Sequence, residues 1–144
     1  MNVDDRWVCS RCLSLMTRGQ NCGNCGFSEA DYRPKAHQLP PEALLKQRYL
    51  VASVLGEGGF GITYAGWDLT LDKPIAIKEY FPAGLTGRDT SRTFSAEPLE
   101  GPGKSWYFAG RERFLREARI LAMLSGMRGI VSVRDFFEEN DTAY

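Results

Sequence analysis

The 144-residue chain has no apolar run that approaches the roughly 20 residues needed to cross a bilayer. Its first six residues, Met1 to Arg6, include two aspartates and lead into no apolar stretch, so they do not predict a signal peptide. It also lacks a surplus of either charge, because Lys plus Arg and Asp plus Glu both number 18. Polyanion-binding proteins usually have a basic surplus, so nucleic acid is not the predicted partner. These absences predict a cytoplasmic protein without a membrane segment in this stretch.

Cysteine does not occur after residue 25, and the four that precede it form two Cys-x-x-Cys pairs separated by nine residues. Each pair predicts a tight turn that presents two thiolates, which suits one tetrahedral zinc ion. Two disulfides are the alternative, but nothing predicts export and cytosolic thiols stay reduced. Four protein ligands leave no open coordination position, so residues 1–30 predict a structural zinc ribbon. Its ligands would be Cys9, Cys12, Cys22 and Cys25.

Histidine is scarce, and the single residue, His37, lies in a polar, proline-interrupted stretch. This composition predicts a semi-rigid linker over residues 31–48. Because four thiolates already complete the metal site, we expect His37 to be a solvated linker residue. The remaining residues, 49–144, have enough apolar side chains for a packed core, since 43% of the whole chain is hydrophobic.

Glycine is concentrated between Gly56 and Gly61, where the sequence reads Gly-Glu-Gly-Gly-Phe-Gly. The apolar residues 49–55 before it and residues 62–67 after it each predict a strand. No helical pattern follows, which excludes the strand–loop–helix of a dinucleotide-binding fold. Such glycines let backbone N–H groups approach phosphate oxygens, with Phe60 at the tip as a lid. Taken alone, the segment is equally typical of an ordinary hairpin turn.

A third predicted strand, Ile75-Ala76-Ile77-Lys78, favours the phosphate-binding interpretation. It ends in a lysine, a compact cation that can contact two phosphates. Ala76 lies on the opposite face from its two isoleucine neighbours and is small enough for a flat base to lie against it. The stretch Glu79 to Gly110 carries three prolines and predicts loop or hairpin rather than helix. Its hydroxyls could be phosphorylated, but polar loop filler is the preferred interpretation for Thr86, Thr90, Ser91 and Thr93.

Residues 111–125 predict a helix, because at about 100° per residue their apolar side chains share one face. Glu117 lies within that face. A carboxylate in an apolar stripe is costly unless it meets a cation, and Lys78 is the candidate partner. The alternative is a glutamate at the margin that pairs with Arg113 or stays in water. The face comprises Phe114, Ala118, Leu121, Leu124 and Ser125.

In this order the motifs of residues 49–144 resemble the N-terminal lobe of a bacterial serine/threonine protein kinase. The matching segments are residues 55–63, the Ile-Ala-Ile-Lys strand, the Phe-Leu-Arg-Glu-Ala-Arg-Ile-Leu helix and residues 129–140, which resemble the next strand and its turn. The resemblance implies an α+β fold, an antiparallel sheet plus one regulatory helix, incomplete and preceded by the zinc ribbon. Thr63 replaces the valine of the pattern, and it keeps a β-branched wall for adenine.

The resemblance also implies residue roles. Lys78 would hold the α- and β-phosphates of ATP, and Glu117 would orient Lys78. Leu121 and Val133 would pack beneath this pair. The intact kinase would transfer the γ-phosphate to protein hydroxyls, with Mg²⁺ bound by residues absent from this chain. Nucleotide binding is assigned to Leu55, Gly56, Glu57, Gly58, Gly59, Phe60, Gly61, Ile62, Thr63, Ala76 and Lys78.

The catalytic-loop aspartate, its asparagine and the Asp-Phe-Gly aspartate of the family do not occur in the 144 residues. The hinge strand would begin near residues 142–144, between the lysine strand and the one near Val133. We therefore predict no phosphoryl transfer by this chain alone and weak nucleotide affinity. Two alternatives are a zinc-ribbon or pseudokinase docking module without catalysis, and a zinc-ribbon nucleic-acid binder, which the neutral charge disfavours.

Overall fold

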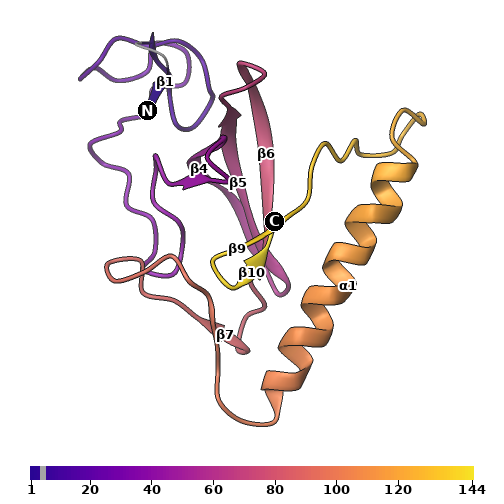
Figure 1. Cartoon of the computed structure of the whole chain (residues 1–144). Helices are drawn as coiled ribbons and strands as arrows, with labels where there is room; N and C mark the ends of the chain where they lie inside the picture. Colours follow the sequence, from indigo (N-terminus) through magenta and orange to yellow (C-terminus); the bar gives the residue numbers. More distant parts are fainter. Residues whose placement is uncertain (4–5) are drawn as a thin grey trace.

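The computed structural model describes residues 1–3 and 6–144, so Asp4 and Asp5 of the predicted non-signal N-terminus lie outside the described residues. A strongly curved sheet lies beside one long helix (Figure 1). Among the described residues, no helix is both long enough and apolar enough to span a membrane. The elements are β1 (Asn2–Val3), β2 (Arg6–Trp7), β3 (Leu44–Leu45), β4 (Tyr49–Gly58), β5 (Gly61–Asp68), β6 (Lys73–Tyr80), β7 (Thr86–Gly87), β8 (Glu97–Pro98), α1 (Gly103–Met123), β9 (Glu138–Glu139) and β10 (Thr142–Ala143).

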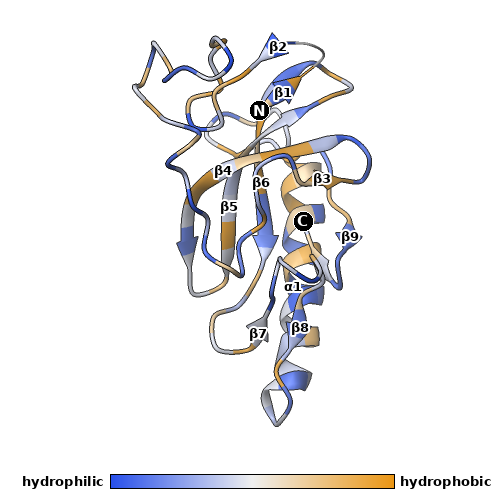
Figure 2. Cartoon of the chain, turned by 90° about the vertical axis from the view of Figure 1, so that its left-hand side faces the viewer, coloured by the Kyte–Doolittle hydropathy of each residue, from blue (hydrophilic) through white to orange (hydrophobic). Residues whose placement is uncertain are grey.

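The central sheet has four antiparallel strands in the order β3-β4-β5-β6, of which β4, β5 and β6 are seen side by side in Figure 2. β4 and β5 form a hairpin in which Gly58 pairs with Gly61. β5 then pairs with β6 along its whole length, from Gly61 opposite Tyr80 to Asp68 opposite Lys73. A Cβ atom at Gly61 would lie 2.1 Å from the carbonyl oxygen of Glu79, so the close approach of β6 requires glycine there. The predicted strand–glycine loop–strand hairpin and the lysine strand are confirmed, and both hairpin strands extend into the glycine segment.

The two faces of this sheet follow from the alternation of side chains along β5 and β6. One face, here called the back face, carries Ile62, Tyr64, Ile77 and Glu79, all of them buried. Residues 39–45, Phe81 and other apolar side chains cover it, so that the main hydrophobic core lies on this side. The opposite, front face carries Thr63, Ala65, Trp67, Ala76, Lys78 and Tyr80.

The front face is covered at its two ends and open in the middle. At one end, Met1, Val3 and Val8 of the N-terminal region pack against Ala65 and Trp67. At the other end, Tyr80 packs against the helix in a small cluster with Tyr107, Leu115 and Ala143. Between the two covers lie the exposed residues Ala76 and Lys78.

Helix α1 begins eight residues earlier than the sequence indicates, so the prediction of loop for residues 103–110 is wrong. Pro102 precedes the first helical residue, a position that its fixed φ angle suits, and no further proline interrupts the helix. The early turns are held against the sheet because Tyr107 is fully buried and the Tyr80 hydroxyl donates a 3.1 Å hydrogen bond to its carbonyl. Gly110 permits this contact, since a Cβ atom there would lie 2.1 Å from the Tyr80 hydroxyl.

Residues 129–140, where a strand and its turn were expected, hold only the first strand of a short C-terminal hairpin. Only Glu138–Glu139 is strand, paired with Thr142–Ala143 around a turn at Asn140 and Asp141, which both have positive φ angles. Within the described residues, 131–136 make no backbone–backbone hydrogen bonds. The Thr142 hydroxyl donates a hydrogen bond to the Tyr80 carbonyl, which places β10 next to the end of β6, although β10 pairs as a strand with β9.

Candidate functional site

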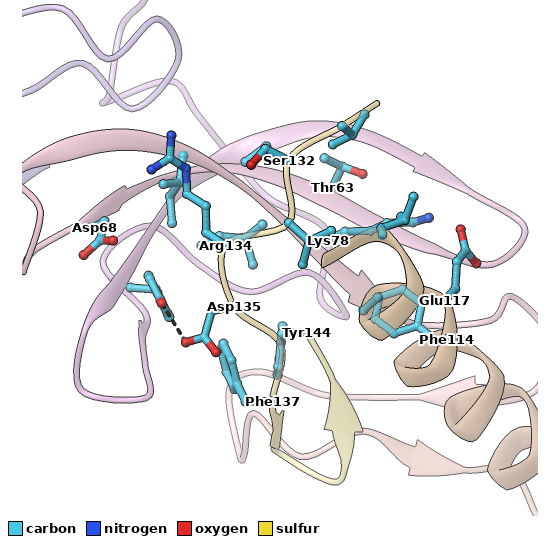
Figure 3. Close-up of a pocket in the computed structure, with 18 of the residues that line it drawn as sticks. Thr63, Asp68, Lys78, Phe114, Glu117, Ser132, Arg134, Asp135, Phe137 and Tyr144 are labelled. Atoms are coloured by element: carbon cyan, nitrogen blue, oxygen red, sulfur yellow. Dashed lines mark hydrogen bonds between the residues drawn. The ribbon is translucent and has the colours of Figure 1, made fainter. Parts of the chain in front are cut away.

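A cavity of about 650 Å³ lies along the outer edge of β6, between that strand, helix α1 and residues 131–135 (Figure 3). The edge is open there because β6 is the last strand of the central sheet. Its volume lies within the range of about 300–1,000 Å³ that is typical of small-molecule sites. The cavity wall includes Thr63, Ala76 and Lys78 from the sheet and Glu117 and Leu121 from the helix.

Three of the predicted nucleotide-binding residues meet on the open part of the front face. Thr63 lies directly opposite Lys78 in the β5–β6 register, and Ala76 follows two residues before the lysine on the same face. Thr63 is half-buried, while Ala76 and Lys78 are exposed to the cavity. The fold therefore leaves a small side chain and a cation next to each other, with a wide space in front of them.

Lys78 and Glu117 line the same cavity but do not form the predicted ion pair in the described part of the chain. The Lys78 ammonium lies 5.6 Å from the ring centre of Phe114, a cation–π contact. Glu117 is exposed, and the residue of this helical segment that is buried against the sheet is Leu115. Phe114, Ala118 and Leu121 of the predicted face are half-buried, and the buried face extends to Leu115. Glu117 lies at the solvent side of this face, next to Lys78 in Figure 3.

The four glycines of the hairpin differ in whether packing within the chain requires glycine at their position. Added Cβ atoms at Gly56, Gly58 and Gly59 would meet no protein atom within 4 Å, unlike Gly61. Packing within this chain therefore explains glycine at only the last of the four positions. The other three keep the hairpin backbone bare, which is what close approach of phosphate oxygens needs.

The apolar predicted site residues around the hairpin fall into two groups. Phe60 at the tip is 82% exposed and Leu55 is 58% exposed, so both side chains are free to contact a ligand. The side chain of Ile62 is fully buried in the core of the back face. Only its backbone can contribute to a site on the front.

A buried charge network on the back face was missed by the sequence reasoning. The Arg88 guanidinium donates to both oxygens of Glu79, at 2.6 and 2.9 Å, and both side chains have 0% exposure. The hydroxyls of Tyr64 and Tyr144 donate to the same carboxylate, each at 2.8 Å. Arg88 also donates two hydrogen bonds to the His37 carbonyl. The only sequence signal was Glu79 itself, a carboxylate that alternation puts on the apolar face of its strand.

Two further carboxylates lie near the far end of the cavity. Hydrogen bonds from the Arg48 guanidinium, at 2.8 Å, lower the pKa of Asp68 to about 2 against the opposing effect of burial. Burial raises the pKa of Asp135, but donors from Lys46 and the Tyr49 hydroxyl outweigh burial and lower it overall. Figure 3 shows the Tyr49–Asp135 bond at the cavity wall. Both acids are therefore ionised at neutral pH and fixed in place.

The four cysteines come together as one cluster at the N-terminal end. Their sulfurs all lie within 4.8 Å of one another and none forms a disulfide. The Cys9–Cys25 and Cys12–Cys22 sulfur distances are 3.7 and 3.6 Å. Four thiolates at about 2.3 Å from a tetrahedral zinc ion would lie about 3.8 Å apart, so the cluster fits zinc. The predicted ligand set could hold a metal such as zinc.

No family model matches the chain. Among solved structures, the chain is similar to the apo form of PpkA-294, a fragment of a bacterial Ser/Thr kinase, with a TM-score of 0.68 and 36% sequence identity. The match covers 74% of this chain, which spans 37% of the length of the PpkA-294 chain. The likeness supports a kinase-like fold, and the curled antiparallel sheet with its single helix is consistent with an N-lobe-like α+β fragment.

Proposed function

We propose that this chain is the ATP-binding half of a serine/threonine protein kinase, which transfers the γ-phosphate of ATP to protein hydroxyls. The observation that supports this most is the open middle of the front face, where Thr63, Ala76 and Lys78 adjoin the glycine hairpin. Ala76 and Thr63 would contact the adenine, and the bare hairpin backbone and Lys78 would contact the phosphates. The similarity to PpkA-294 supports the same assignment at the level of the family.

In the proposed complex, Glu117 takes a role that it does not have in the free chain. Nucleotide phosphates would draw the Lys78 ammonium away from the Phe114 ring, and the Glu117 carboxylate lies on the wall of the same cavity. A rotation of the helix would then join the two charges. The catalytic base and the magnesium-binding carboxylates of a kinase are absent from the sequence, so we propose that the isolated chain binds nucleotide weakly and does not transfer phosphate.

The test is equilibrium binding of MgATP to the zinc-loaded chain and to the variant Lys78→Ala. We expect Lys78→Ala to weaken binding at least about tenfold, since it removes a charge-assisted contact to phosphate. Lys104→Ala is the matched control, because Lys104 lies on α1 and pairs with Glu100 outside the cavity.

Equal affinity in wild type and Lys78→Ala, or no binding to either, would contradict the nucleotide assignment and favour a docking module without catalysis. A phosphotransfer assay on the same samples should show no turnover. Turnover that is lost in Lys78→Ala would overturn the proposed inactivity of the isolated chain.

We further propose that the cysteine cluster is a structural zinc ribbon. Its fit to four tetrahedral thiolates supports this, and a closed ligand set leaves no position for a substrate. Cobalt substitution should give the intense charge-transfer absorption of a tetrathiolate site with one ion per chain, and Cys12→Ser should reduce that absorption. Absence of a thiolate-to-metal band would rule out this site.

A further inference from the structure

The glycine hairpin is held from outside by the segment that the sequence indicates is a linker. Glu57, between Gly56 and Gly58, accepts hydrogen bonds from three side chains of this linker segment: Lys35 at 3.1 Å, His37 at 2.8 Å and Gln38 at 2.7 Å. The Glu57 side chain is 29% exposed as a result. His37 is therefore not the solvated residue that we expected.

Two residues of this segment, His37 and Leu39, are themselves fixed to the body of the sheet. The His37 ring stacks on Phe81 at 5.5 Å, and its carbonyl accepts two hydrogen bonds from Arg88, the buried partner of Glu79. The backbone N–H of Leu39 donates to the Tyr64 hydroxyl. The segment that binds Glu57 is thus held by Arg88, and the buried partner of Arg88, Glu79, directly follows Lys78 in β6.

Two further hydrogen bonds join β4, the strand that leads into the hairpin, to Ser10 and Tyr32. The β4–β5 register is irregular between Val51 and Gly56, where β4 hydrogen-bonds to the N-terminal region through the Ser53 hydroxyl and the Val54 N–H. The Ser53 hydroxyl donates to the carbonyl of Ser10, which lies between Cys9 and Cys12, at 2.6 Å. The Val54 N–H donates to the Tyr32 hydroxyl at 2.9 Å.

We propose that the N-terminal region positions the glycine hairpin, with Glu57 as the positioning residue, and that loss of the metal from the cysteine cluster loosens the hairpin. The first hold acts on the hairpin itself, and the second acts on the strand that leads into it. The consequence for ATP rests on the proposed nucleotide function, but the hold on the hairpin does not. Glu57 connects the hairpin to residues 35–38, and Ser53 connects the strand that leads into the hairpin to Ser10, between two cysteines of the metal cluster.

The charge of Glu57 agrees with this role. Partial burial raises its pKa, while the hydrogen bonds from His37, Lys35 and Gln38 together outweigh burial and lower it. The carboxylate is therefore ionised at neutral pH and attracts all three donors. Added Cβ atoms at Gly56 and Gly58 would meet no atom within 4 Å, so side-chain packing does not restrain the backbone there. The β4–β5 pairing and the hydrogen bonds to Glu57 hold it instead.

Hydrogen exchange of the peptide that spans residues 52–61 tests the proposal in the zinc-loaded full chain. Glu57→Gln should speed exchange of residues 57–60 about threefold to tenfold, because it removes one charge-assisted clamp at a partly exposed site. Glu112→Gln, an exposed residue of α1, is the matched control and should change nothing. The urea unfolding midpoint of Glu57→Gln should match wild type, which distinguishes a positioning role from a structural one.

Chelation of zinc from the wild-type chain should speed exchange of residues 53–57 in the same experiment, because Ser10 and Tyr32 then lose their fixed positions. Unchanged exchange in Glu57→Gln, or after chelation, overturns the corresponding half of the proposal. If exchange responds but MgATP binds neither protein, the positioning of the hairpin stands and the proposed nucleotide function fails. If MgATP binds wild type and Glu57→Gln equally while exchange is unchanged, the proposed nucleotide function stands and the positioning of the hairpin by Glu57 fails.

Discussion

Lys78 and Glu79 are neighbours in one strand, yet they point to the two faces of the sheet and meet opposite surroundings. Glu79 is fully buried and its carboxylate accepts hydrogen bonds from one arginine and two tyrosines. Lys78 is exposed to a cavity and contacts only an aromatic ring among the described residues. The buried charges of the back face are thus paired within this chain, whereas Lys78 and Glu117 on the front side are exposed. Stability and ligand binding are therefore assigned to different faces, and variants should separate them.

The largest expected effect is removal of the metal, which acts on the cover at one end of the front face. The first 30 residues bury few apolar side chains, so metal binding should supply most of their folding free energy, on the order of 10 kcal/mol for a site of this type. Chelation should unfold this region and expose Trp67, against which it packs, while the core of the back face persists. Tryptophan fluorescence and near-UV circular dichroism measure this. Loss of all secondary structure would show that the two faces are not independent.

The second-largest loss of stability should come from breaking the buried Arg88–Glu79 pair on the back face. Arg88→Leu leaves the Glu79 carboxylate without its cation, and removal of one partner of a buried pair costs roughly 3–5 kcal/mol. Urea unfolding measures this, with Arg92→Leu, an exposed residue of the same loop, as the control. Replacing both partners, Glu79→Gln with Arg88→Leu, should recover part of the loss. A cost below about 1 kcal/mol for Arg88→Leu would mean that the back face is not held by this network.

Sequence reasoning found the front face better than the back face, for physical reasons. The hairpin strands and the orientation of Lys78 follow from local patterns, namely apolar runs, glycines and a period of two. Arg88 and His37 lie in segments without periodicity, and their contacts join residues 51 positions apart, so no local pattern could indicate them. The clamp on Glu57 was missed for the same reason. For Glu117 the sequence left two interpretations open, and the exposed one fits the structure because the helix residue that is buried against the sheet is Leu115.

A smaller effect on stability should come from lowering the pH, which protonates Asp68 at the edge of the back face. The folded pKa of Asp68, about 2, lies below its ordinary value near 3.8, so the Arg48–Asp68 pair stabilises the fold above that ordinary value. This contribution is lost as the pH falls from about 4 through about 2. Because Arg48 is partly exposed, we expect about 1–2 kcal/mol.

The measurement is the unfolding free energy of wild type and Asp68→Asn between pH 5 and pH 2. The difference between the two proteins isolates Asp68 from the other acids and should shrink as the pH falls. Asp31→Asn, at an exposed position, serves as the control. A difference that does not depend on pH would show that Asp68 acts through packing instead of charge.

The smallest effect on stability belongs to Glu117, the front-face counterpart of Glu79. It is exposed and makes no ion pair with Lys78 in the described part of the chain, so Glu117→Gln should change the unfolding free energy by less than about 0.5 kcal/mol. In MgATP the same variant should lose part of the ligand-induced rise in the melting temperature, because the carboxylate then has a partner to orient. Glu112→Gln should match wild type under both conditions. A large loss of stability without nucleotide would mean that the Lys78–Glu117 pair already exists in the free protein, and the contrast between the two faces would disappear.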